Sequence, residues 1–135
     1  MSTGGSYCLY MKESDIIRPP PAKLLVMVDE NDNSINDSAW GFEMPGDRAT
    51  AWVDVPSKRH GSACGFNFAD GHAEIRHWMY PQYLAAEVPY GRLDYTYVEV
   101  NTPELDPDIF WCGWRVSYPT DAMAAAWLMN FPDYP

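Results

Sequence analysis

Residues 60–78 read HGSACGFNFADGHAEIRHW, and this stretch decides the fold of the chain. The residues on either side of Asp70-Gly71 alternate in polarity, and an Asp-Gly pair favours the tight two-residue turn of a β-hairpin. Side chains of a strand point alternately to its two faces. We therefore expect one apolar face and one polar face, made respectively of Phe66, Phe68, Ala73 and Ile75, and of Asn67, His72, Glu74, Arg76 and Trp78.

Short apolar or alternating segments predict further elements around this hairpin. The run at residues 23–28 predicts a strand buried on both faces, because it is almost unbroken in its hydrophobicity. Further strands are expected at residues 40–44 and 51–55, paired as a second hairpin, and at residues 93–100. Short helices are expected at residues 81–87, at residues 108–114 after an Asp106-Pro107 cap, and at residues 120–131. We expect a single α+β domain over residues 1–135, with an antiparallel β-sheet and short helices.

Composition and charge exclude several classes of function. The chain has 135 residues and a formal net charge of -10, which argues against nucleic acid as a partner because phosphate binding needs a basic surface. No run of 18 apolar residues occurs and no signal peptide is visible, so we expect no membrane insertion of this chain. Cys8, Cys64 and Cys112 are too widely spaced for a zinc motif, and one disulfide stays open as an alternative to three buried thiols.

An acidic segment is the strongest candidate for a metal site. Residues 29–54 hold seven acidic residues against one basic residue, Arg48. The spacing of Asp32, Ser34, Asn36 and Glu43 is similar to the ligand ladder of a calcium loop, because calcium prefers closely spaced oxygen donors. Asp37 stands where such a loop has its sharp-turn glycine. The alternative is a solvated turn whose Asn and Asp side chains bind their own backbone.

Carboxylates and aromatic rings suggest a second kind of site. Two carboxyl groups on either side of a sugar make a glycosidase, and the candidates for such a pair are Asp29, Glu30, Asp37 and Glu74. Exposed aromatic rings stack on sugar faces, and Trp40, Trp52 and Trp78 are the candidates for that role. The alternative is that these rings fill the core.

The His60–Trp78 stretch also carries a family likeness. His60, the nine residues after it and Asp70-Gly71-His72 resemble the motif of the prepilin-type, processing-associated His-(nine residues)-Asp-Gly domain family, pseudopilin-like proteins of planctomycetes and verrucomicrobia. Residues 28–30 and 34–37 resemble the loop that precedes this motif in the family, Ser6-Tyr7 resembles the start of its domain, and residues 106–109 with Trp111 resemble its tail. The likeness covers about residues 6–114.

The resemblance implies a pilin-like globular head, whose antiparallel sheet is normally laid on a long N-terminal helix. It also implies export through a type II secretion or pilus-like machine, a secreted, periplasmic or cell-surface location, and other subunits of that machine as partners. The family's leader and apolar helix are missing from this chain, so we expect a head without the long helix. No catalytic residues carry over from the family, and His60, Asp70 and Gly71 carry over only as motif positions.

Two hypotheses of function follow. The first is a noncatalytic structural protein, the soluble head of a pseudopilin-like subunit, with calcium stiffening the acidic segment. The second is a secreted carbohydrate-active protein, either a small glycoside hydrolase or a glycan-binding module, in which the loop carboxylates and tryptophan rings act on glycans.

Overall fold

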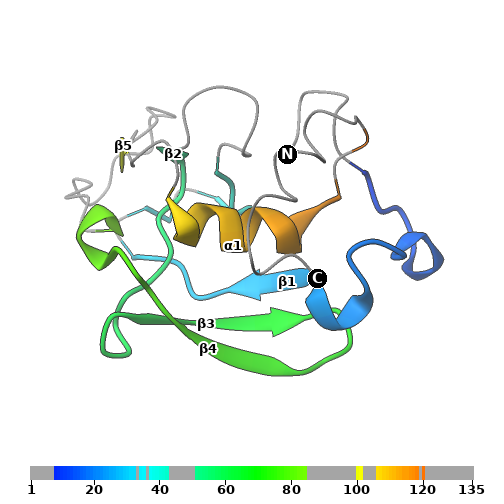
Figure 1. The fold of residues 1–135 in the computed structure, drawn as a ribbon, viewed down its shortest axis with the longest axis horizontal. Coiled ribbons are helices and arrows are strands. Elements are labelled where there is room, and N and C mark those ends of the chain that lie inside the picture. Colours follow the sequence, from blue (N-terminus) through cyan, green and yellow to red (C-terminus); the bar gives the residue numbers. More distant parts are fainter. Residues whose placement is uncertain are drawn as a thin grey trace.

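The computed structural model describes residues 8–32, 34–35, 37–42, 51–84, 100–101, 106–118 and 120. They form a small α+β arrangement in which an antiparallel sheet is accompanied by one α-helix and three short 3-10 turns (Figure 1). The strands are β1 (Leu25–Val28), β2 (Ala51–Trp52), β3 (Ala63–Phe68), β4 (Ala73–His77) and β5 (Val100–Asn101), and the helix is α1 (Pro107–Val116). The 3-10 turns are Glu13–Asp15, Pro21–Lys23 and Pro81–Leu84.

The main sheet has three strands in the order β1-β3-β4, and both pairs are antiparallel. Within the described residues β1 is therefore an edge strand, and the expectation that it is buried on both faces is wrong. Val26 is 55% exposed and Met27 is 68% exposed. An apolar run alone does not distinguish a central strand from an edge strand. The central position belongs to β3, which supplies the buried side chains of Cys64, Phe66 and Phe68.

The hairpin of β3 and β4 is confirmed, but its turn is one residue longer than expected. The backbone N–H of Phe68 donates to the carbonyl of His72 at 3.0 Å, and that of Gly71 donates to the carbonyl of Phe68 at 2.9 Å. Gly71 has a φ of +91°, whereas the φ of Asp70 is not positive. A two-residue turn of the expected type needs positive φ at both positions. The chain instead forms a three-residue loop that ends in a left-handed glycine.

The longer turn shifts the register by one residue and exchanges the faces of β4. Phe66 pairs with Glu74, and Gly65 pairs with Ile75. Because paired residues point to the same face of the sheet, the side chains of Ile75 and Phe66 point to different faces. Ile75 is 59% exposed, while Trp78 is 6% exposed and packs edge-on against Phe66. The predicted membership of the two faces is therefore wrong for every residue on the β4 side of the turn. Ala73 and Ile75 leave the face of Phe66, and that face instead holds His72, Glu74, Arg76 and Trp78.

Helix α1 begins as the sequence predicts. The Asp106 side chain accepts a hydrogen bond from the backbone N–H of Asp108 at 2.9 Å, and Pro107 occupies the first turn. The helix lies along the sheet (Figure 1), and the ring centroids of Trp111 and Phe66 are 5.1 Å apart. The core between them is formed by Trp52, Val55, Cys64, Phe66, Phe68, Trp78, Leu84, Ile109, Trp111 and Cys112.

The remaining predictions fall partly outside the described residues. Phe42 bridges Trp52 in antiparallel fashion, and the N–H of Asp54 donates to the carbonyl of Gly41, so the two segments of the second hairpin do pair. Of the strand expected at residues 93–100 only Val100 is described, and of the helix expected at residues 120–131 only Thr120. The helix expected at residues 81–87 is a 3-10 turn as far as residue 84. Within the described part of the chain, no helix has the length and hydrophobicity needed to cross a bilayer.

Candidate functional site

A pocket of about 620 Å³ lies beside β1, and it gathers several of the predicted site residues. All four residues of β1 line it, and so do Asp29, Glu30 and Asp37, three of the four carboxylates predicted from the sequence, together with Trp40. Glu74 lies elsewhere, on β4, beside a separate hollow of about 350 Å³. The structure thus brings together one aromatic ring and three acids that are up to eight positions apart in the sequence.

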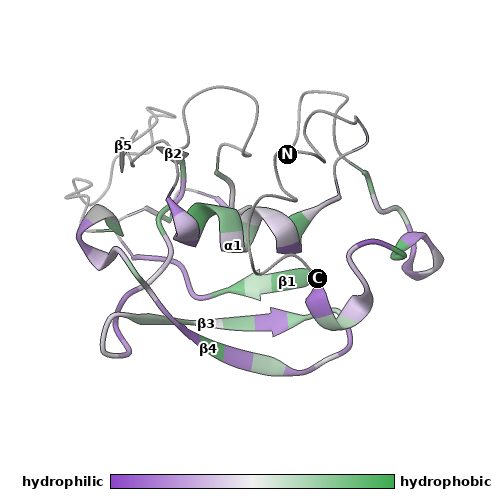
Figure 2. Ribbon diagram, viewed as in Figure 1, coloured by the Kyte–Doolittle hydropathy of each residue, from purple (hydrophilic) through white to green (hydrophobic). Residues whose placement is uncertain are grey.

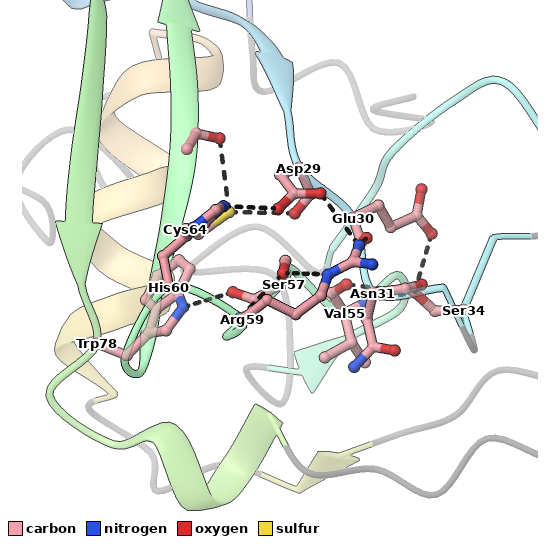
Figure 3. A network of polar contacts seen from close by, with 11 residues as sticks. Asp29, Glu30, Asn31, Ser34, Val55, Ser57, Arg59, His60, Cys64 and Trp78 are labelled. Carbon is pink, nitrogen blue, oxygen red and sulfur yellow. Dashed lines mark hydrogen bonds and ion pairs between the residues drawn. The ribbon is translucent and has the colours of Figure 1, made fainter.

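Asp29 is held at the end of β1 by two basic side chains (Figure 3). Nη2 of Arg59 lies 3.2 Å from Oδ1 of Asp29, and Nε2 of His60 lies 3.7 Å from Oδ2. Arg59 also donates to the carbonyl of Glu30 at 3.0 Å and to the hydroxyl of Ser57 at 3.1 Å. The guanidinium therefore fixes the backbone as well as the carboxylate. No local signal indicates this role for Arg59, which lies thirty positions away in the chain.

Glu30 is a carboxyl group of this pocket whose protonation is altered by its surroundings. Its Oε1 lies 2.9 Å from the hydroxyl of Ser34 (Figure 3). Burial raises the pKa of Glu30 to about 7, the hydrogen bond from Ser34 opposes this, and the negative charges of Asp54 and Asp37 add to it. A carboxyl group that titrates near neutral pH can both give and take a proton there. The pocket therefore contains one group with the titration of a general acid or base.

Asp37 and Ser34 shape the loop that faces β1. Oδ1 of Asp37 accepts a hydrogen bond from the backbone N–H of Ala39 at 2.6 Å, as in an Asx turn. The buried hydroxyl of Ser34 accepts from the N–H of Val55 at 3.1 Å and lies within 3.2 Å of the carbonyl of Val55. These contacts join the loop to the segment that follows β2.

The predicted calcium ligands are only partly described. Asp32 is exposed, and the Ser34 hydroxyl is occupied by the contacts above, while Asn36 and Glu43 lie outside the described residues. Among the residues that the structure describes, no three side chains of the His, Cys, Asp and Glu types are grouped to hold a metal ion.

Three of the four motif residues, Asp70, Gly71 and His72, lie at the tip of the hairpin. Nδ1 of His72 lies 2.5 Å from Asp70, Nε2 lies 3.0 Å from Glu74, and the imidazole stacks on Phe68 with ring centroids 4.3 Å apart. The hydrogen bond to Asp70, and then that to Glu74, raises the pKa of His72, and the same contact with His72 lowers the pKa of Asp70. His60 lies at the other end of β3, beside Asp29.

Two of the three predicted stacking rings are core residues. Trp52 is 0% exposed and the indole N–H of Trp78 donates to the carbonyl of Ser57 at 2.8 Å, so neither ring presents a face to a sugar. This corrects the expectation for Trp52 and Trp78. Trp40 is half-buried and lines the pocket, with its ring centroid 6.0 Å from that of Trp52.

Two buried polar anchors were missed by the sequence reasoning. Asp108, in the first turn of α1, accepts hydrogen bonds from the backbone N–H groups of Met79 and Tyr80 at 2.9 and 2.8 Å, and lies 3.5 Å from Arg76. The thiol of Cys64 donates to the carbonyl of Asp29 at 3.1 Å, and burial raises its pKa to about 12, which disfavours the reactive thiolate form. The sequence shows an acidic residue in the first turn of a predicted helix, but it does not show which groups bind the Asp108 carboxylate.

No protein-family model, curated protein or solved structure matches the chain.

Proposed function

We propose that this chain is a noncatalytic structural protein, the soluble head of a pseudopilin-like subunit that works with other subunits of a secretion or pilus-like machine. The observation that carries the proposal is the use of the motif residues. Gly71 provides a backbone conformation, and Asp70 and His72 bind each other and their neighbours at the hairpin tip. Polar atoms that bind within their own turn support a role in the fold for Asp70 and His72, while the fourth motif residue, His60, lies at the other end of β3 beside Asp29.

The position of the protein in the cell tests this proposal. In the organism that encodes the chain, antibodies against it should detect it in the periplasmic or sheared cell-surface fraction, and this signal should be lost when the genes of the secretion or pilus-like machine are deleted. A cytosolic enzyme from the same cells serves as the fractionation control. Detection in the cytosolic fraction of both strains would contradict the proposal.

Calcium stiffening belongs to the same proposal and has a separate test. The supporting residue is the exposed Asp32, beside a loop already tied down by Ser34. Millimolar calcium should raise the melting temperature, magnesium should raise it less because it demands a more rigid octahedral site, and Asp32→Asn should reduce the calcium effect. An unchanged melting temperature would rule out calcium stiffening but would not affect the proposed structural role.

A second candidate function is the binding or hydrolysis of glycans. It is supported by the pocket beside β1, where Glu30 and Asp29 lie with Trp40. A panel of chromogenic glycosides tests it, with Glu30→Gln as the variant, because this change keeps the size of the side chain and removes its titrating proton. Turnover that Glu30→Gln abolishes would rank this function first, and absence of turnover and of glycan binding would remove it.

A further inference from the structure

We propose that β1 is a self-association edge, at which two copies of this chain pair in antiparallel fashion about a two-fold axis and join their sheets. The starting observation is the composition of the edge. Leu25, Val26, Met27 and Val28 are all apolar, and within the described residues β1 pairs with β3 on one side only. Unpaired edge strands usually carry charges or proline that prevent such pairing.

The other edge of the same sheet provides the comparison. β4 carries Glu74, Arg76 and His77 among its five residues, so a second copy approaching it meets charges. Figure 2 shows β1 in hydrophobic colours along its length, whereas purple and green segments are mixed along β4. One edge is thus protected by its side chains and the other is not.

The pocket beside β1 offers room for the side chains of an added strand. It extends along all four residues of the strand and is continued by the apolar side chains of Ile35 and Val116. Since alternate side chains of a neighbouring strand point to the same face, one or two apolar side chains of the second copy would enter this pocket.

The two ends of β1 carry charges of opposite sign, so two antiparallel copies of the strand would place opposite charges near each other. Lys23 precedes the strand, and Asp29 and Glu30 follow it. If the axis lies between Val26 and Met27, Lys23 of each copy faces Glu30 of the other, which carries its full charge at a pH above its pKa of about 7. If the axis passes through Val26, Lys23 faces Asp29 and joins the ion pair that Asp29 makes with Arg59. Lys23 forms no ion pair with the residues that the structure describes. An interface in which the same patch meets itself in this way is the commonest kind in dimers.

The edge is short, and this limits the strength of the dimer. Four residues extend over about 13 Å, and the register of β1 against β3 shifts between Leu25 and Met27. Such an edge is smaller than the interface of a permanent dimer. We therefore expect a dimer that dissociates on dilution, with a dissociation constant in roughly the micromolar range.

Sedimentation equilibrium over about a hundredfold range of protein concentration tests the proposal. The wild-type chain should shift from monomer to dimer, and Val26→Lys should weaken the dimer by roughly tenfold or more. Ile75→Lys is the matched control, because Ile75 is as exposed as Val26 but lies on the protected edge; it should leave the dimer unchanged. A wild-type chain that stays monomeric, or a dimer affected equally by both variants, would overturn the proposal.

A mixing experiment tests the antiparallel arrangement. Lys23→Glu and Glu30→Lys should each weaken self-association, because each places like charges at both ends of the paired strands. In an equimolar mixture the two variants should associate with each other, since opposite charges then face each other at both ends of the paired strands. Circular dichroism first establishes that each variant is folded. If both are folded and the mixture associates no better than either variant alone, Lys23 does not face Glu30, and the same test is made with Asp29→Lys in place of Glu30→Lys. Failure of both mixtures shows that the two-fold antiparallel pairing is wrong.

Discussion

At the scale of single residues, Asp108 is a buried acid that joins the first turn of α1 to the segment after β4. It is 1% exposed and accepts from two backbone N–H groups at the end of β4 while pairing with Arg76. Removing a buried charge leaves its partners without hydrogen bonds. Asp108→Ala should therefore lower the free energy of unfolding by about 3 kcal/mol, measured by urea denaturation. Asp32→Ala, at an exposed site without calcium, should change it by less than about 0.5 kcal/mol; equal effects would contradict this role.

The raised pKa of Glu30 predicts how the stability of the fold depends on pH. Its pKa in the folded chain is raised from 4.5 to about 7, so between these values the folded state binds more protons than the unfolded state. The contribution of Glu30 to stability is therefore fully present below pH 4.5 and is lost as the pH rises through 7. Glu30→Gln should become progressively more stable relative to wild type between about pH 5 and pH 8, as measured by melting temperature. A difference that is constant over this range would exclude the raised pKa.

At the scale of elements, the turn of the β3-β4 hairpin depends on Gly71. A β-carbon added to Gly71 would meet no atom within 4 Å, so the cost of Gly71→Ala comes from its φ of +91° and not from crowding. We expect a loss of about 1 kcal/mol in the free energy of unfolding. Gly65→Ala is the control within β3, because its β-carbon would lie 3.9 Å from Ile75 in ordinary contact. Gly65→Ala should leave stability equal or higher, and a larger loss there than at Gly71 would contradict the role of the turn.

The elements also show how far the sequence can be interpreted. Asp70-Gly71 predicts a hairpin correctly, and Asp106-Pro107 predicts the start of α1 correctly, because both signals are local to the chain. The loop length was not predictable, because Asp-Gly also suits a three-residue turn with one left-handed glycine. This single residue moved Trp78 from the expected solvent face to the core.

The sequence predicted which residues belong to the candidate site better than it predicted how these residues are arranged. Asp29, Glu30 and Asp37 could be nominated because they are close in sequence and follow an apolar run. The contact of Asp29 with Arg59 depends on how the loop after Pro56 returns to β1, which is a tertiary feature. Similarly, no local pattern distinguishes the half-buried Trp40 at the pocket from the fully buried Trp52 behind it.

At the scale of the whole molecule, the excess of negative charge predicts how salt affects stability. Nineteen acidic residues face nine basic ones, which gives a net charge of -10. Self-repulsion of like charges destabilises the folded state, because the charges are closer together there than in the unfolded chain. Salt screens this repulsion, and the Debye length falls to about 8 Å at physiological ionic strength. Sodium chloride should therefore raise the melting temperature at pH 8, with most of the effect reached by about 0.15 M.

The pH dependence of this salt effect separates repulsion from other effects of salt. Near the pI of about 4.4 the net charge is close to zero, so added salt should no longer stabilise the chain and should weaken exposed ion pairs such as Arg59–Asp29. Paired melting curves with and without salt at pH 8 and near the pI measure the difference. If salt stabilises the chain equally at both pH values, the stabilisation arises from exclusion of salt from the protein surface, and the net charge is not what limits the stability of the fold.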